Sequence, residues 1–170
     1  MKRTKTKAEA PNFSHWEINE YVPALVTWLY NKTAANASRL YRKRFGVGLA
    51  EWRIIAYLGI HDKGTNAEIC DYIGLDKAAV SRSISSLRSR GYLVTRPRNG
   101  RDIEVRLTPQ GLKLGNRILA VALEIEENLM HGINATERRA YIKTTNAILR
   151  NLIRVQRFVD DAYLRSRKLT

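Results

Sequence analysis

The hydrophobic residues of this chain recur mainly at the spacing of three and four positions that is typical of an α-helix. One such pattern predicts a long helix from about Ile18 to Arg44, with an apolar face wide enough to pack against more than one neighbour. A second helix is expected to begin at Leu49. The inner face of this second helix is predicted to consist of Leu49, Trp52, Ile55, Ala56 and Leu58.

A short third helix is expected after a turn at residues 62–64. Thr65 and Glu68 have the T-x-x-E spacing of a capping box, in which the hydroxyl and the carboxylate satisfy backbone N–H groups at a helix start. Gly74 permits the left-handed turn that ends this helix. Its apolar side is predicted to be formed by Ile69, Tyr72 and Ile73.

A fourth helix is expected from Lys77 to Arg90, with Asp76 as its N-cap. It would bury three residues at helical spacing, Val80, Ile84 and Leu87. The rest of its surface combines small side chains with cations, which allows close approach to a nucleic-acid groove. These surface residues are Lys77, Ala78, Ser81, Arg82, Ser85, Arg88 and Ser89.

A β-hairpin is predicted next, because Asn99-Gly100 is the strongest short signal for a two-residue turn between antiparallel strands. Such a turn would place Val94 opposite Val105, Arg96 opposite Ile103, and Arg98 opposite Arg101. Two like charges facing each other at an exposed tip are mildly destabilising, and they make sense if a phosphate or a minor groove lies between them. Pro97 is tolerated because the ribbon is an edge.

Two helices complete the chain. Thr108 is expected to cap the first, with Pro109 at its first position and its end near His131. Asn134 and Glu137 form a second capping box, and the last helix is expected to run to about Tyr163. That helix has two apolar stripes, more than a compact monomer needs. They are Tyr141, Ile148, Leu152, Val155 and Val159 in one and Ile142, Leu149 and Ile153 in the other.

The net charge of the chain limits the classes of partner that it is expected to bind. The 170 residues include 30 Lys and Arg against 16 Asp and Glu, a formal net charge of +14, which attracts a polyanion. No apolar run is long enough to span a membrane, and no apolar segment follows the basic N-terminus as in a signal peptide. Residues 1–14 are predicted to be a disordered basic tail. A cytoplasmic protein fits best.

The sequence gives no support for an enzyme or a metal site. It lacks a nucleophile constellation, a glycine-rich phosphate loop and an HExxH motif, and its three histidines have no ligand spacing. The single cysteine, Cys70, excludes an internal disulfide and is expected to be a small buried residue. We therefore predict no cofactor and no catalytic residues.

The order of helix, tight turn, helix and arginine-tipped hairpin over residues 65–108 is the pattern of a winged helix-turn-helix, which reads duplex DNA. In the segments GVGLAEWRIIAYL, ICDYIGLDKAAVSRSISSLRSRGYL and RLTPQG, taken in this order, the chain resembles the MarR family of bacterial transcriptional regulators. The resemblance covers nearly the whole chain. One departure is in the wing, where the family often has Asp and Arg two residues apart and this chain has Asn99 and Arg101, with Asp102 nearby.

The resemblance implies a mainly α fold with a small β-hairpin wing, dimerised through long N- and C-terminal helices. It divides the chain into the tail at 1–14, an N-terminal dimerisation helix at 15–48, a DNA-binding lobe at 49–108 and C-terminal dimerisation helices at 109–170. The expected dimer-interface residues are Ile18, Val22, Leu25, Ile148, Leu152, Val155 and Val159.

DNA would be read by the fourth helix in the major groove. Arg82 is the best candidate for base readout, because a fork of donors matches O6 and N7 of guanine. Arg98 and Arg101 would reach the minor groove or flanking phosphates. The alternative, that these arginines only solvate a helix face, usually holds for one isolated arginine. The full predicted DNA-binding set is Thr65, Asn66, Lys77, Ala78, Ala79, Ser81, Arg82, Ser85, Arg88, Arg98, Asn99 and Arg101.

The predicted function is a homodimeric repressor on a pseudo-palindromic operator, released by a small aromatic acid or its CoA thioester. By resemblance, the residues bordering the ligand cavity are His15, Trp16, Trp28, Tyr30, Trp52 and Arg53. For each tryptophan, an ordinary core or interface role is the alternative. The alternative function is an architectural DNA-binding protein without effector and with little sequence preference.

Overall fold

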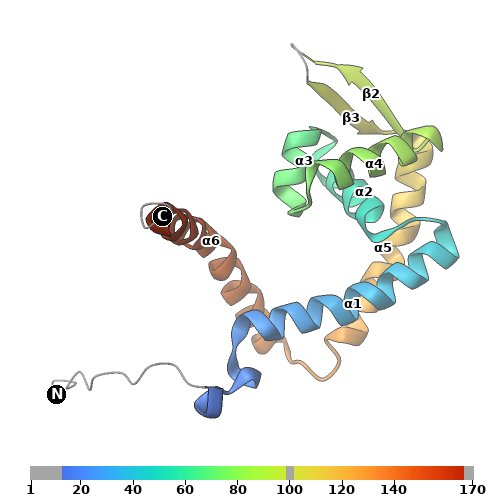
Figure 1. Ribbon diagram of the computed structural model, residues 1–170. Helices are drawn as coiled ribbons and strands as arrows, with labels where there is room; N and C mark the ends of the chain where they lie inside the picture. The colour runs from blue at the N-terminus through green and yellow to red at the C-terminus, as the bar shows by residue number, and fades with distance from the viewer. Residues whose placement is uncertain (1–12, 99–101, 167–170) are drawn as a thin grey trace. The chain divides into compact units, whose positions relative to one another are not determined.

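The computed structural model describes residues 13–98 and 102–166, and it divides the chain into two compact units, residues 1–122 and 123–170 (Figure 1). Most of the predicted N-terminal tail lies outside the described residues, as do Asn99, Gly100 and Arg101. The helices are α1 (Val22–Phe45), α2 (Leu49–His61), α3 (Asn66–Ile73), α4 (Lys77–Ser89), α5 (Pro109–Leu129) and α6 (Ala135–Ser166). The strands are β1 (Lys63–Thr65), β2 (Leu93–Pro97) and β3 (Ile103–Leu107).

The first helix begins later than the hydrophobic pattern predicts. Ile18–Glu20 is a separate 3₁₀ turn, and α1 starts at Val22 after an extended Tyr21. Pro23 lies in the first turn of α1, where a missing N–H breaks no helical hydrogen bond. Gly46 ends the helix in the left-handed conformation, with φ of 67°.

The core of the first unit lies where α2 meets α3, α4 and β3, and part of α5 contributes to it. In Figure 1 the helices α2, α3 and α4 lie together beneath the hairpin of β2 and β3. Fully buried side chains of this core are Ile54, Ile55, Leu58, Ile69, Val80, Leu87, Leu93, Val105 and Ile118. The predicted burial of Val80, Ile84 and Leu87 on α4 is confirmed.

Two predicted inner faces need correction. On α2, Ile54 and Tyr57 are buried, whereas Leu49, Trp52 and Ala56 are only half-buried. Helix α2 contacts neighbours on several sides, so a single stripe does not describe its burial. On α3, Tyr72 is 61% exposed. This eight-residue helix buries Ile69, while the ring of Tyr72 stacks at the surface against Tyr57 and His61, with centroids 5.1 and 5.0 Å away.

The sheet has three antiparallel strands in the order β1-β3-β2, and the sequence pattern did not predict β1. The segment Lys63–Thr65, expected as part of a turn, pairs with β3, placing Gly64 opposite Val105. A Cβ at Gly64 would lie 2.5 Å from Cε1 of Tyr57, so this strand approaches α2 as closely as only glycine permits.

The predicted hairpin register is wrong by one residue. The observed pairs are Val94 with Arg106, Thr95 with Val105, Arg96 with Glu104 and Pro97 with Ile103. The N–H of Arg98 donates to the carbonyl of Asp102 at 2.8 Å, so Arg98 pairs with Asp102, and the predicted partner Arg101 lies outside the described residues. A one-residue shift exchanges the two faces of a strand. The observed register keeps Thr95 beside the buried Val105 and leaves Val94 on the exposed face.

The predicted caps of the last two helices are confirmed. The hydroxyl of Thr108 accepts from the N–H of Gly111 at 3.0 Å, and Asn134 and Glu137 bond reciprocally at 3.0 and 3.1 Å. Helix α5 ends at Leu129, two residues early, and α6 extends past Tyr163. Of the side chains of α6 that the structure describes, only Thr145 and Ala147 are even half-buried. Within the described residues, no helix is both long and apolar enough to cross a bilayer.

Candidate nucleic-acid interface

Helix α4 is anchored by one face and exposed on the other. Asp76 caps it, with its carboxylate accepting from the N–H of Ala79 at 2.8 Å, and Val80 and Leu87 are completely buried. The predicted DNA-contacting side chains lie on the opposite side, where all except the half-buried Ala79 are exposed. They are Lys77, Ala78, Ala79, Ser81, Arg82, Ser85 and Arg88. The sequence therefore produces a fixed helix with a free cationic surface.

A groove of about 250 Å³ separates α4 from the wing. It brings together predicted residues from two segments, and its wing side is formed by residues that were not predicted to bind DNA. Its lining includes Thr65 and Asn66 from the start of α3, Lys77, Ser81, Ser85 and Arg88 from α4, and Thr95, Asp102 and Ile103 from the wing. Oδ1 of Asn66 is buried and has no hydrogen-bond partner among the described residues. Lys77, Arg88 and the serine hydroxyls of α4 supply hydrogen-bond donors with which this side of the helix can receive a phosphodiester strand.

Thr65 shapes the groove through its helix cap. It is 6% exposed, its hydroxyl accepts from the N–H of Glu68 at 3.3 Å, and the Glu68 carboxylate accepts from the N–H of Thr65 at 2.7 Å. The predicted capping box is therefore present. These hydrogen bonds, foremost the one from the Thr65 backbone, lower the pKa of Glu68, and the nearby Arg98 acts in the same direction.

Ion pairs connect both strands of the wing to the rest of the lobe. Nη1 of Arg98 lies 3.5 Å from Oε1 of Glu68 on α3. At the other strand, Arg106 contacts Glu104 and Asp62, each at 2.8 Å. The hydrogen bond from Arg106 is the main cause of the lowered pKa of Glu104. The Arg106–Asp62 pair links β3 to the loop before β1 and thereby braces the wing, which the sequence did not predict.

A second cavity, of about 260 Å³, lies on the other side of α4. Arg82 lines this cavity together with Gly48, Ser83, Ser86 and Arg42 at the end of α1. The predicted base-reading arginine thus stands on the edge of α4 that is turned toward α2. Arg42 is exposed and was not predicted as a site residue, because no local spacing connects α1 with α4.

Polar contacts fix α4 against the junction of α1 and α2. Arg90 lies 2.6 Å from Oε1 of Glu51 and donates to the carbonyl of Gly46 at 2.8 Å. The hydroxyl of Ser86 donates to the same oxygen of Glu51 at 2.7 Å, while the other Glu51 oxygen accepts from the N–H of Gly48. One carboxylate therefore caps α2 and orients the C-terminal half of α4.

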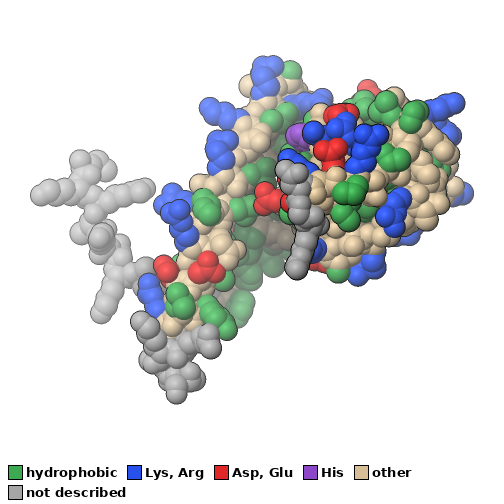
Figure 2. Space-filling model, turned by 90° about the horizontal axis from the view of Figure 1, so that it is seen from above, with side chains coloured by type: hydrophobic (Ala, Val, Ile, Leu, Met, Phe, Trp, Pro, Cys, Tyr) green, Lys and Arg blue, Asp and Glu red, His purple; other side chains and the backbone are tan. Residues whose placement is uncertain are grey.

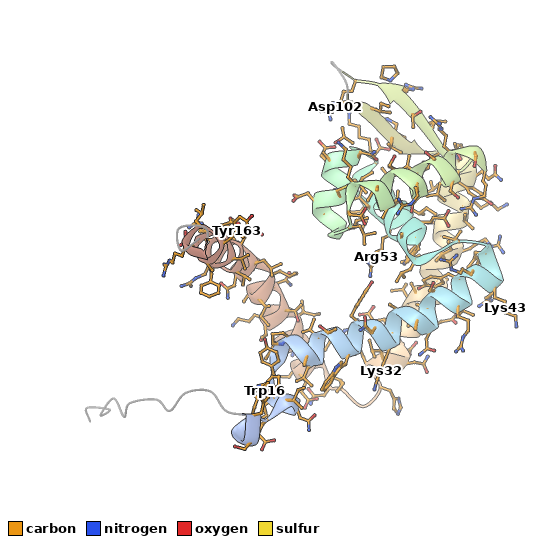
Figure 3. All side chains as sticks on the ribbon, viewed as in Figure 1. Trp16, Lys32, Lys43, Arg53, Asp102 and Tyr163 are labelled. Atoms are coloured by element: carbon orange, nitrogen blue, oxygen red, sulfur yellow. The ribbon has the colours of Figure 1, made fainter. Side chains whose placement is uncertain are left out.

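The predicted ligand-cavity residues fall into separate contacts. The guanidinium of Arg53 projects from α2 toward α1 and lies 5.2 Å from the ring centroid of Tyr30 (Figure 3). The other aromatic contacts are Trp52 with Tyr41 at 6.1 Å and Trp16 with Phe13 and Tyr21 at 5.8 and 5.4 Å. Trp28 is partly exposed, and the side chain of His15 lies outside the described part of the chain.

The structure bears on two predictions, one about the burial of Cys70 and one about metal-binding side chains. Cys70 is half-buried on α3 rather than fully buried. Within residues 13–98 and 102–166, no group of three or more His, Cys, Asp or Glu side chains is arranged to hold a metal ion.

Known proteins share part of this sequence and this fold. A sequence model of the MarR family matches residues 45–102, which span α2–α4 and the first strand of the wing, β2. No curated protein matches the chain significantly. Similar solved structures include a MarR/EmrR family transcriptional regulator from Acinetobacter sp. ADP1, with 28% identity, a TM-score of 0.76, and 82% of this chain and 99% of that chain covered.

Two further structures share the fold. A MarR family regulator from Silicibacter pomeroyi has 23% identity and a TM-score of 0.76, covering 83% of this chain and 96% of that one. A mutant MarR from E. coli, complexed with operator DNA, has 19% identity and a TM-score of 0.67, covering 78% and 97%. These relatives are regulators, which confirms that the chain is not an enzyme. Residues 45–102 of the chain match the MarR family of transcriptional regulators, and the fold is the winged helix-turn-helix found in structures of that family.

Proposed function

We propose that this protein is a homodimeric cytoplasmic repressor that binds a pseudo-palindromic operator and is released from it by a small aromatic acid or its CoA thioester. The observation that carries the proposal is the cationic outer face of α4, held rigidly between two open cavities by Asp76 and the Arg90–Glu51 pair. The lobe at 49–108 is the DNA-binding part, and the helices outside it are the dimerisation parts.

In this proposal α4 enters the major groove, and each side of the helix faces one sugar-phosphate strand. Arg82 reads a base edge, assisted by Lys77, Ser81 and Ser85. On the wing side, Asn66 and Arg88 contact phosphate, and Arg98 exchanges its weak pairing with Glu68 for the DNA backbone. Asn99 and Arg101 complete the wing contact. On the other side, Arg42 contacts the opposite strand.

Dimerisation is supported by apolar side chains that the single chain leaves exposed. Ile18, Val22 and Leu25 near the start of the chain are each at least 40% exposed. The predicted interface residues of α6, Ile148, Leu152, Val155 and Val159, are likewise at least 41% exposed. Exposed apolar surface of this extent, on each of these two segments, is typical of a subunit interface. A dimer would present two copies of α4 to half-sites about 34 Å apart.

An aromatic acid is the effector class that suits the residues around Arg53. The guanidinium already lies over the ring of Tyr30, so it can pair with a carboxylate while aromatic rings cover the apolar part of the ligand. His15, Trp16, Trp28 and Trp52 are the further candidates. A precedent within the fold is BpsR of Bordetella bronchiseptica, whose DNA binding is regulated by 6-hydroxynicotinic acid.

The test is binding of purified protein to a fragmented genomic library, read by sequencing, with and without pooled aromatic acids and their CoA thioesters. The proposal predicts a small number of palindromic sites that disappear when one compound is added. An architectural protein would instead cover the library broadly, with a steep salt dependence and no response to any compound.

A further inference from the structure

Helix α6 has a continuous basic stripe that the proposed operator contact does not use. At 100° per residue, six cations fall on an arc of about 80° along the whole helix. We call them the α6 stripe: Arg139, Lys143, Arg150, Arg154, Arg157 and Arg165. Figure 2 shows Lys and Arg side chains following one edge of the arm that α6 forms.

Acidic residues of the protein neutralise little of the positive charge of the α6 stripe. None of its six residues forms an ion pair with another described residue, and Arg139 bonds only the hydroxyl of Thr136, at 3.2 Å. Arg138, which lies off the arc, does have a partner, Glu126. One acidic residue, Asp161, shares the arc with the six cations. The stripe therefore has a net charge of about +5.

Repulsion between like charges at this spacing destabilises the helix. Arg150 and Arg154 are four residues apart, and so are Arg139 and Lys143, and each such like-charge pair destabilises a helix. Arg139 and Arg165 are separated by about 39 Å along the axis, at 1.5 Å per residue. Over the same length a DNA duplex carries roughly one negative charge per 1.7 Å. A duplex could thus offset every charge of the stripe.

The residues of α6 outside the stripe indicate whether the stripe binds a DNA duplex or a membrane surface. A basic amphipathic helix binds a bilayer by inserting its apolar face, which here includes Leu152 and Val159. The proposed dimer buries that face, leaving a cationic edge flanked by isolated apolar side chains such as Phe158 and Leu164 rather than by an apolar face that could insert. We propose that the α6 stripe is a second, sequence-independent binding surface for duplex DNA, separate from the winged lobe. The inference rests on the proposed dimer.

The experiment measures binding of the full-length protein to a 40-base-pair random-sequence duplex over a series of salt concentrations. The variant K77A/R82A/R88A removes the lobe cations of α4, and the triple variant R150Q/R154Q/R157Q is then added to it. The lobe variant is expected to retain salt-dependent binding that the stripe substitutions weaken roughly 10- to 100-fold at physiological salt, because each lost phosphate contact lowers the salt slope by about 0.9. The charge-preserving control R150K/R154K/R157K should bind as before.

Other outcomes overturn the inference. Equal affinity and equal salt slope with and without the stripe substitutions would show that α6 does not contact the duplex. Stripe-dependent binding to vesicles containing phosphatidylserine, without stripe-dependent binding to the duplex, would assign the stripe to a membrane surface instead. The proposed function fails separately, if sedimentation finds a monomer or if R82A in the otherwise native chain retains every specific genomic site.

Discussion

In the lobe of α2–α4 and the three strands, side chains such as Ile54, Ile69 and Val80 are completely buried within one chain. In α6, residues of the same kind, such as Leu152 and Val155, are more than half exposed. The lobe forms its core from segments that are close together in sequence. Helix α6 is long and apolar on one face, and the side chains of that face stay exposed in the single chain. The exposure of the apolar stripes that the sequence predicts on α6 supports the proposed dimer.

The largest effect is expected from charges placed on the apolar face of α6. Leu152→Asp with Val159→Asp would bury two unpaired carboxylates in the proposed interface, which costs several kcal/mol. The dimer dissociation constant should rise by a factor on the order of 1000. Sedimentation velocity measures it. Asn151→Asp adds the same charge to an exposed flank of α6 and should leave the dimer intact; if both variants behave alike, the comparison is wrong.

Within the lobe, truncation should separate buried from exposed positions on one short helix. Ile69→Ala removes a fully buried side chain and should lower the free energy of unfolding by about 2–5 kcal/mol. Tyr72→Ala on the same helix, where the ring is mostly exposed, should cost less than about 1 kcal/mol. Urea titration monitored by circular dichroism measures both. Equal costs would contradict the burial described for α3.

DNA binding should depend on Arg82 of α4 and not on a basic residue of the same unit that lies outside the proposed DNA contacts. Arg82→Ala should weaken operator binding by about 1–3 kcal/mol and relax preference at one base pair. Arg117→Ala on α5, whose guanidinium lies 5.5 Å from the ring of Phe45, serves as the control and should change affinity little. Fluorescence anisotropy with a recovered operator and its point variants measures the difference. Unchanged preference in R82A would remove Arg82 from base readout.

A smaller effect is expected at the cap of α3. Thr65→Ala removes the hydroxyl that accepts from the N–H of Glu68 and should lower the free energy of unfolding by about 1 kcal/mol. Thr65→Ser retains the hydroxyl and should recover most of that loss. If serine is no better than alanine in chemical denaturation, the hydrogen bond is not the source of the stability.

The smallest effect concerns pH. The folded protein lowers the pKa of Glu68, so its ionised carboxylate stabilises the fold above the unfolded-state pKa. That contribution is lost as the pH falls through the lower folded-state pKa. Glu68→Gln should therefore be less stable than the native chain at pH 7 and equally stable in strong acid. Thermal unfolding across this pH range provides the measurement, and a difference independent of pH would exclude the carboxylate charge as the cause.

Features that depend on neighbouring residues could be predicted from the sequence. The caps at Thr65, Asp76, Thr108 and Asn134 are all present, since a cap needs only a side chain and the next turn of its own helix. The cationic surface of α4 was found by the same reasoning, because burial of every third or fourth residue leaves the others exposed.

Features that depend on distant segments could not be predicted. Strand β1 exists because it pairs with β3, and three residues have no detectable period of their own. The hairpin register places Thr95 beside the buried Val105, a pairing that the local turn signal did not specify. Arg42 joins the cavity beside Arg82 through the packing of α1 against α2, a contact that sequence spacing does not encode.

The central claim is that α4 and the wing read specific duplex sequences. The most direct test sequences the genomic fragments bound by the native protein and by R82A at physiological salt, in parallel. The account predicts a few palindromic sites for the native chain, with half-site centres about one helical turn apart, and their loss or relaxation at one base in R82A. Broad coverage that is identical for the two proteins would contradict it.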